Sequence, residues 1–283
     1  MERDREAALR TLLDRHGFHF SKARGQNFLT DPAILDAIAD ASEADGTCGV
    51  IEIGPGAGSL TASLARRAGK VVAVELDRTL LPVLEETLAP FSDVEIVQGD
   101  ILRLDLNALI TEHLSGLTPV VCANLPYNIT TPVLEKLVET PALPSFTVLV
   151  QKEVAQRLSA PEGSREGGAF SLFLQYHMEA RMLFTVGREA FLPPPKVNSA
   201  VLRCVRRVRP PVETADEAFF FRVVRGGFLL RRKTLYNSLS AALPERSREE
   251  IREAMRLCGL EETIRGEALT LQQYAALAQA LHG

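Results

Sequence analysis

The chain has 283 residues, 46% of them hydrophobic and 24% charged, a composition that excludes an intrinsically disordered protein. No apolar run approaches the roughly 20 residues of a membrane-spanning helix, and the N-terminal MERDREAALR lacks the apolar core of a secretory signal. The formal net charge of −4 excludes a protein that is basic throughout.

The four cysteines are far apart in the sequence and include no Cys-x-x-Cys pair. We therefore expect neither a disulfide framework nor a metal site, and we expect a cytoplasmic protein. The pair His16 and His19 has no neighbouring cysteine to complete a metal site, which favours two surface histidines.

The first two-thirds of the chain alternates short apolar runs with helix-period stretches, which predicts a doubly wound parallel sheet. The predicted strands are rich in β-branched residues, and they are Gly49–Ile53, Lys70–Val74, Val94–Val97, Pro119–Cys122 and Phe146–Val150. The predicted helices between them are Leu60–Arg67, Leu80–Leu88 and Pro132–Glu139. Two further runs, Arg181–Val186 and Val197–Val205, would complete a mostly parallel seven-stranded sheet.

A glycine-rich turn, EIGPGAG (Glu52–Gly58), follows the first predicted strand. Glycines there let the backbone approach a ligand, although Ser59 replaces the third glycine of a dinucleotide-binding turn. The next two strands end in Glu75, which can accept from both ribose hydroxyls, and Asp100, which can accept from an adenine amine. Three acids at successive strand ends favour an adenosine ligand that carries a positive charge and no phosphates. The alternative is that Glu75 and Asp100 are capping acids.

The fourth predicted strand ends in Asn124, Leu125, Pro126 and Tyr127, the most specific signal in the chain. An adenine amine is a poor nucleophile because its lone pair is delocalised into the ring. The amide oxygen of Asn124 and the carbonyl of Leu125 or Pro126 can each accept one N–H and so localise that lone pair. Tyr127 offers a face for an unstacked base. The pattern predicts methyl transfer to an adenine amine by positioning; the alternative is a turn closed by Asn and Pro.

The segment FLPPPKV (Phe191–Val197) predicts a rigid extended connector. Two roles stay open for its first residue: Phe191 stacks on the second face of the base, or it packs in the core. In the first case Lys196 is placed to meet an RNA phosphate.

The prolines after Arg209 mark a domain boundary, because consecutive prolines interrupt both helices and strands. We expect a catalytic domain at 1–209 and a helical RNA-binding domain at 210–283, with helices at Asp216–Leu230, Arg232–Ala242, Arg248–Leu257 and Thr270–Leu281. The segment 200–240 holds nine basic and three acidic residues, which predicts a phosphate-binding face despite the acidic total. Its candidate RNA contacts are Arg231, Arg232 and Lys233. A solvated surface is the alternative.

Together these segments resemble the ribosomal RNA adenine N6-dimethyltransferases. The matching motifs occur in that family's order, and they are Gly25–Leu29 (GQNFL), Glu52–Gly58 (EIGPGAG), Gln98–Asp100 (QGD), Asn124–Ile129 (NLPYNI) and Phe191–Val197 (FLPPPKV). The match continues at Arg231–Leu235, Asn237–Leu239 and Arg265–Leu269, so the resemblance spans about residues 22–281.

The resemblance implies a Rossmann-like class I methyltransferase fold, a small C-terminal all-helical domain and S-adenosyl-L-methionine as cofactor. Cofactor positions carry over to matching residues, namely Asn27, Leu29, Gly54, Glu75, Asp100 and Asn124, and we expect Gly56 and Ile101 to contact the cofactor as well. Base-holding roles carry over to Asn124 and Tyr127, and a further one to Phe191, beside the carbonyl acceptor already argued for Leu125 or Pro126. The chain is most similar to the small-subunit type, which implies a monomer that dimethylates two adjacent adenosines near the 3′ end of 16S rRNA in the immature small subunit.

The chain departs from the family at Gly167–Phe170, where the family usually has Tyr-Gly-Arg-Leu, and at Tyr236, where it usually has Arg. Both changes reduce the charge available to RNA. Three other functions stay open: a resistance-type methyltransferase of large-subunit RNA, a non-catalytic assembly factor that binds RNA, and, more remotely, a DNA adenine methyltransferase.

Overall fold

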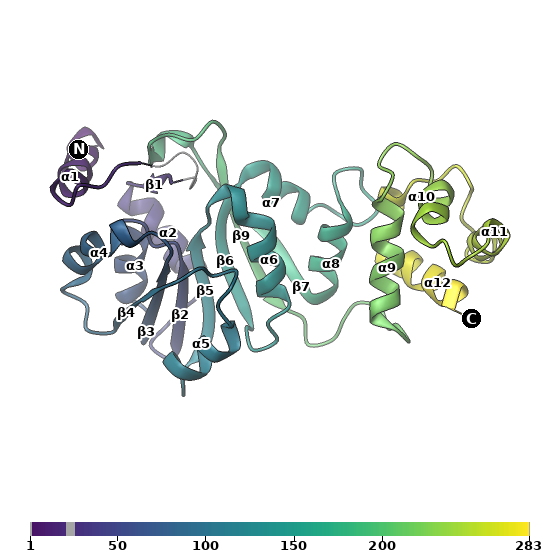
Figure 1. Ribbon diagram of the computed structural model, residues 1–283, viewed down its shortest axis with the longest axis horizontal. Coiled ribbons are helices and arrows are strands. Elements are labelled where there is room, and N and C mark those ends of the chain that lie inside the picture. The colour runs from purple at the N-terminus through teal and green to yellow at the C-terminus, as the bar shows by residue number, and fades with distance from the viewer. Residues whose placement is uncertain (1, 21–25, 283) are drawn as a thin grey trace. The chain divides into compact units, whose positions relative to one another are not determined.

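The computed structural model describes residues 2–20 and 26–282 (Figure 1). The chain divides into two compact units, Met1–Ala155 with Arg181–Arg206 and Gln156–Ala180 with Arg207–Gly283. Within the described ranges, no helix combines the length and the apolar character that crossing a membrane requires.

The first unit is built on a seven-stranded sheet in the order β4-β3-β2-β5-β6-β9-β7. Its strands are β2 (Cys48–Ile53), β3 (Lys70–Glu75), β4 (Val94–Gln98), β5 (Thr118–Asn124), β6 (Ser145–Gln151), β7 (Met178–Val186) and β9 (Ser199–Arg206). Strands β2 to β6 pair in parallel, and β9 runs antiparallel to β6. The predicted mostly parallel, seven-stranded sheet is therefore confirmed.

Burial of the sheet on both faces explains why the strand sequences do not alternate between apolar and polar residues. Every residue of β2 is buried, as expected of a parallel strand that helices cover on both sides. The helices of this region are α2 (Pro32–Ala41), α3 (Ser59–Ala65), α4 (Leu81–Leu88), α5 (Leu106–His113) and α6 (Thr130–Val138). Ile38 on α2 and Leu64 on α3 lose all their exposed surface in the core that they form with β2 and its neighbours.

The order in which the strands are added across the sheet reverses at β2, which has β3 on one side and β5 on the other. In doubly wound sheets, the crevice at the carboxyl ends of strands on either side of such a reversal is the usual ligand site. The register pairs Ile53 with Val74 and Glu75 with Gln98, so the ends of β2, β3 and β4 lie along one edge.

Two short elements near this edge have no periodic signal in the sequence. Strand β1 (Phe28–Leu29) pairs antiparallel with β8 (Phe191–Leu192), and Leu29 lies opposite Phe191. Helix α1 (Glu2–Arg15) precedes them, and Leu13 and Phe18 pack with Phe28 in a separate hydrophobic cluster. Two-residue strands are fixed by tertiary packing, so pattern alone does not predict them.

The second unit is helical. It contains α8 (Ala169–His177), α9 (Glu217–Phe228), α10 (Leu235–Ala242), α11 (Arg248–Leu257) and α12 (Leu271–His282), and α7 (Lys152–Leu158) crosses from the first unit into it. Phe220, Leu239 and Tyr274 are fully buried in its core. The expected C-terminal helical region is present, with helix ends within a few residues of those predicted.

The division between the units differs from the expected boundary after Arg209, because Gln156–Ala180 belongs with the helical unit. Leu172 and Tyr176 on α8 join the core of that unit, and the Tyr176 and Phe220 ring centroids are 5.4 Å apart. Helix α8 follows the strand-rich region directly, so sequence order placed it with the sheet, whereas its apolar face packs on α9.

Arg206, at the end of β9, acts as a structural cap of α6 rather than as a surface charge. Its guanidinium donates to the backbone carbonyls of Leu143, Val138 and Thr140 at 2.8–2.9 Å, and more weakly to that of Leu137. A helix ends with unsatisfied carbonyls, and a cation there also favours the negative end of the helix dipole.

We predict that Arg206→Met lowers the free energy of unfolding by about 2–3 kcal/mol, because several carbonyls lose a charged donor. Urea unfolding followed by circular dichroism measures this loss. The matched control is Arg209→Met, which removes an exposed arginine nearby. Equal unfolding midpoints for the two variants would contradict the capping role.

Candidate active site

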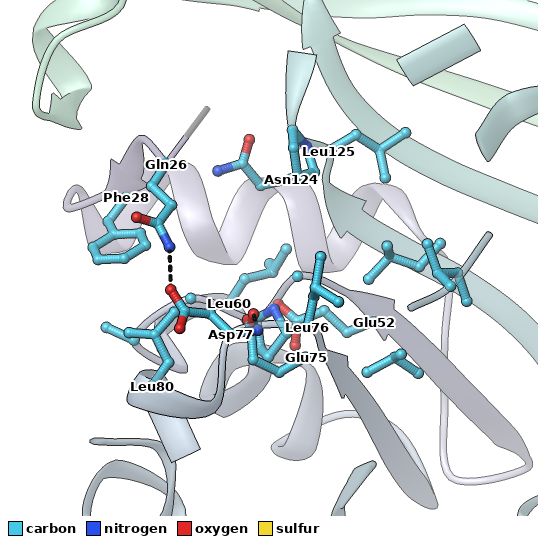
Figure 2. A pocket seen from close by; sticks show the side chains of 18 of the residues that line it. Gln26, Phe28, Glu52, Leu60, Glu75, Leu76, Asp77, Leu80, Asn124 and Leu125 are labelled. Atoms are coloured by element: carbon cyan, nitrogen blue, oxygen red, sulfur yellow. Dashed lines mark hydrogen bonds between the residues drawn. The ribbon is translucent and has the colours of Figure 1, made fainter. Parts of the chain in front are cut away.

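A pocket of about 260 Å³ opens at the carboxyl edge of the sheet (Figure 2). Its walls come from the β1 region, the β2–α3 turn and the ends of β3, β4 and β5. Four acids line it, Glu52, Glu75, Asp77 and Asp100, and its described lining includes no lysine or arginine. The volume suits an organic ligand rather than a bare ion or a single water, and the charge disfavours a phosphate.

The β2–α3 turn brings the backbone to the pocket. Gly54 and Gly56 have φ angles of 68° and 61°, in the left-handed region that other residues avoid. A Cβ on Gly56 would also lie 2.9 Å from the Phe28 ring, so the turn leaves no room for a side chain there. The turn therefore requires glycine at both positions.

Glu52 is a buried acid at the base of the pocket, with 1% of its surface exposed. Burial raises the pKa of Glu52 to about 8, and the nearby charge of Glu75 acts in the same direction. Among the described residues, its Oε2 has no hydrogen-bond partner. A buried carboxyl in this state favours a cationic or hydrogen-bond-donating ligand group beside it.

Glu75 ends β3 with its carboxylate held by backbone donors. The Asp77 N–H donates to Oε1 at 2.7 Å, and burial nevertheless raises the pKa of Glu75. Asp77 itself accepts from Nε2 of Gln26 at 2.9 Å, so the β1 region is joined to the end of β3 (Figure 2). Sequence patterns missed Asp77 as part of the site, because an acid after a strand is an ordinary cap.

The end of β4 supplies Asp100 and Ile101. Oδ1 of Asp100 accepts from the Leu102 N–H at 3.0 Å, and Ile101 is buried in the pocket wall. Leu76, from the end of β3, also lines the pocket although 56% of its surface is exposed. An exposed leucine between acids provides an apolar surface for a flat ligand group, and no sequence pattern indicates this role.

Asn124 ends β5 across the pocket from Glu75 and Asp77 (Figure 2). Its Nδ2 donates to the backbone carbonyl of Asn27 at 3.1 Å. A carbonyl only accepts, so this contact fixes which end of the amide faces Asn27. The Oδ1 atom consequently points away from Asn27 and is oriented to accept.

The backbone after Asn124 offers two carbonyls of different character. The Pro126 carbonyl accepts from the Ile129 N–H and from Oγ1 of Thr130, both at 3.2 Å. These two bonds use the acceptor capacity of that oxygen. Of the two predicted acceptors, the Leu125 carbonyl is therefore the one suited to a ligand.

Tyr127 begins the short 3₁₀ helix η3 (Tyr127–Ile129) and lies outside the described pocket lining. Its hydroxyl hydrogen-bonds to Oγ of Ser199, with 2.6 Å between the oxygens. Burial raises the pKa of Tyr127. The ring is half-buried, so one part of its surface stays available.

The remaining predicted site residues divide into two groups. Asn27, Leu29, Gly54 and Gly56 lie in the pocket wall with the acids and Asn124. Phe191 lies outside the pocket wall, because its side chain has no exposed surface and packs in the core with Leu29. Of the two roles left open for Phe191, the structure therefore shows core packing. Gly25 lies outside the described residues.

The basic segment is less available than its sequence suggests. Arg203 donates to the Ala41 carbonyl and to Glu43, Arg207 to the Gln175 carbonyl, and Arg222 to Glu245. Together with the capping Arg206, four of the nine cations therefore have partners within the chain. The others are exposed, and they are Arg209, Arg225, Arg231, Arg232 and Lys233. Lys196 is also exposed.

The described residues hold no group of three histidines, cysteines or acids that could bind a metal ion. His16 instead contacts Glu86, with 2.7 Å between Nε2 and Oε2.

Known proteins share both the sequence and the fold of this chain. The sequence profile of a family described as "Ribosomal RNA adenine dimethylase" matches residues 17–280. A protein of Geobacillus sp. (strain WCH70) named ribosomal RNA small subunit methyltransferase A is 47% identical, over 96% of this chain and 95% of that relative. The protein of the same name from Lysinibacillus sphaericus (strain C3-41) is 45% identical, over 100% and 98%.

Among solved structures, that of the 23S rRNA methyltransferase ErmE aligns with a TM-score of 0.71 and 26% identity, over 90% of this chain and 100% of that one. The profile covers almost the whole chain, across both units. The chain therefore belongs to the ribosomal RNA adenine dimethylase family and is a methyltransferase.

Proposed function

We propose that this enzyme transfers methyl groups from S-adenosylmethionine to the N6 amines of two adjacent adenosines in a hairpin loop near the 3′ end of 16S rRNA, on the immature small subunit. The relatives at 45–47% identity are named as small-subunit methyltransferases, whereas the large-subunit enzyme is 26% identical. The observation that carries the chemistry is the orientation of Asn124, whose amide oxygen is directed away from Asn27 at the end of β5.

The pocket residues fit S-adenosylmethionine. Glu75 would accept from the ribose hydroxyls and Asp100 from the adenine amine, while Leu76 and Ile101 would contact the faces of the base. The Oε2 atom of Glu52, which has no partner among the described residues, would contact the positively charged methionine part of the cofactor, directly or through water. Gly54 and Gly56 keep the turn clear of side chains, and Asn27 and Leu29 close the wall nearest to β8. When bound, the cofactor supplies a methyl group on a positively charged sulfur.

The chain's own contribution to transfer is to hold the target amine. Oδ1 of Asn124 and the Leu125 carbonyl would each accept one N–H, which localises the nitrogen lone pair and aims it at the methyl carbon. Pro126 fixes the backbone there with a φ of −57° and presents no N–H of its own. On methylation the amine nitrogen would give up one N–H proton to solvent, and the donor would leave as a neutral thioether. Positioning of this kind lowers the barrier without a nucleophilic side chain.

Tyr127 would stack on one face of the unstacked base. We assign Phe191 a supporting role, because it packs behind Leu29 rather than in the pocket. The helical region, 210–283 by sequence, would bind RNA through the exposed Arg231, Arg232 and Lys233, with Lys196 as a further phosphate contact.

Asn124→Ala is predicted to lower the rate constant of methyl transfer about 100- to 1000-fold, since it removes one of two acceptors that position the amine. The assay incubates unmethylated small subunits with S-adenosylmethionine and locates methylated adenines by mass spectrometry. Wild-type enzyme should give two adjacent dimethyladenosines.

The matched control for that variant is Asn107→Ala, an exposed asparagine on α5, which should leave the rate unchanged. Calorimetry should show cofactor binding by Asn124→Ala within a few-fold of wild type. Near-normal turnover of Asn124→Ala would remove this residue from the mechanism, and wild-type modification of large-subunit RNA alone would refute the proposed substrate.

Cofactor binding should release a proton from Glu52. With a pKa of about 8, most of this carboxyl is protonated at pH 7, and a bound cation favours the carboxylate. Affinity should therefore rise from pH 6 toward pH 8 and level off above it. Calorimetry at pH 7 in buffers of different ionisation enthalpy counts the released protons. Glu52→Gln should release fewer; an unchanged count would show that Glu52 does not titrate on binding.

The double variant Arg231→Ala/Arg232→Ala should bind small subunits more weakly and with a flatter salt dependence. Each lost phosphate contact reduces the slope of log K against log salt concentration by about 0.7–0.9. The control is Arg222→Ala, whose arginine is paired with Glu245 and should change the slope little. A slope equal to wild type in the double variant would mean that Arg231 and Arg232 face solvent in the complex.

A further inference from the structure

We propose that Ser199 is a positioning residue for methyl transfer: its hydroxyl holds the Tyr127 ring at the tilt at which an unstacked adenine stacks on it. The inference rests on the proposed function, because it needs Tyr127 to contact the target base. Ser199 itself would touch neither the base nor the cofactor.

The contact that carries the inference joins two side chains 72 positions apart. Oη of Tyr127 and Oγ of Ser199 lie 2.6 Å from each other, a short distance for two neutral hydroxyls. Ser199 has no exposed surface. Water therefore has little access to the serine side of this bond, and loss of the serine hydroxyl would leave the phenol without an equivalent partner.

The sheet explains how Ser199 reaches this place. Ser199 is the first residue of β9, and it pairs with Gln151, the last residue of β6. Asn124, the last residue of β5, pairs with Leu149 on the same strand. Because β9 runs antiparallel to β6, its amino end meets the carboxyl ends of β5 and β6. A residue from late in the chain thus lies beside the NLPY segment.

The Tyr127 ring is in this way restrained at both ends. Its backbone follows Pro126, whose φ is fixed near −57°, and its hydroxyl is hydrogen-bonded to Ser199, a fully buried residue of β9. A tyrosine side chain has only two rotatable bonds between those points, so the Ser199 contact selects one ring tilt. Stacking of the target adenine on Tyr127 depends on that tilt, whereas binding of the cofactor in the pocket does not.

The test is a double-mutant cycle on the full-length enzyme with unmethylated small subunits and S-adenosylmethionine. Tyr127→Phe and Ser199→Ala each remove one side of the same hydrogen bond, and each should lower kcat about 3- to 10-fold. The kcat of the double variant should be no lower than that of the less active single variant, because the bond can be removed only once. The cofactor dissociation constant should stay at the wild-type value in all three.

Ser145→Ala is the matched control, a buried serine at the opposite end of the same β6–β9 ladder, opposite Val205. It should leave kcat unchanged. Losses that multiply in the double variant, or a wild-type kcat for Ser199→Ala, would overturn the positioning role.

Tyr127→Ala separates this inference from the proposed function. If Tyr127→Ala is nearly inactive while Ser199→Ala is normal, the base still stacks on Tyr127 and only the role of Ser199 is refuted. If Tyr127→Ala keeps full activity, stacking on Tyr127 is refuted and the role of Ser199 with it.

Discussion

The hydrogen bond from Nδ2 of Asn124 to the Asn27 carbonyl is the interaction on which the proposed chemistry depends. It joins residues 97 positions apart and decides which end of the amide is left to accept. The fold makes it possible in two ways. Strand β5 ends next to β2 at the reversal of the sheet, and the β1–β8 pairing holds the chain at Phe28 and Leu29, directly after Asn27. A local motif therefore acquires its function from long-range pairing.

Much of this arrangement is predictable from the sequence, for a definite reason. Parallel strands buried on both faces appear as uninterrupted apolar runs, and the few residues after each run lie at the ligand edge of the sheet. Glu75, Asp100 and Asn124 were identified in this way, and the structure brings all three to one pocket. The assignment of their roles remains a proposal, supported by the acids, the glycine turn and the oriented amide.

The features of the site that the sequence does not predict depend on contacts between side chains far apart in the chain. The Tyr127–Ser199 and Gln26–Asp77 bonds have no periodic or spacing signal, because each depends on two loops meeting at one edge. Arg206 shows the opposite failure. The sequence predicts a surface charge there, whereas the structure shows that the Arg206 side chain caps α6. Only the fold distinguishes a capping arginine from an exposed one. The same applies to Phe191, which an aromatic-plus-proline motif cannot assign to core or site.

The charge distribution reconciles an acidic protein with an RNA substrate. Four acids are concentrated around the pocket, where a cationic cofactor would bind, and the exposed cations that are candidates for RNA contact lie elsewhere in the chain. Tyr236, which stands where the family usually has arginine, is buried and receives a hydrogen bond and a cation–π contact from Arg252, 5.0 Å from its ring centroid. That position therefore contributes to packing of the helical unit. RNA binding would depend on the exposed group around Arg231–Lys233.

The most direct test of the central claim is a crystal structure with a bisubstrate analogue that links adenosine N6 to the cofactor. We predict that N6 lies within hydrogen-bond distance of Oδ1 of Asn124 and of the Leu125 carbonyl, with the cofactor adenosine between Gly54 and Asp100. A structure in which the N6 group faces any other acceptors, or in which phosphates occupy the pocket, would contradict it.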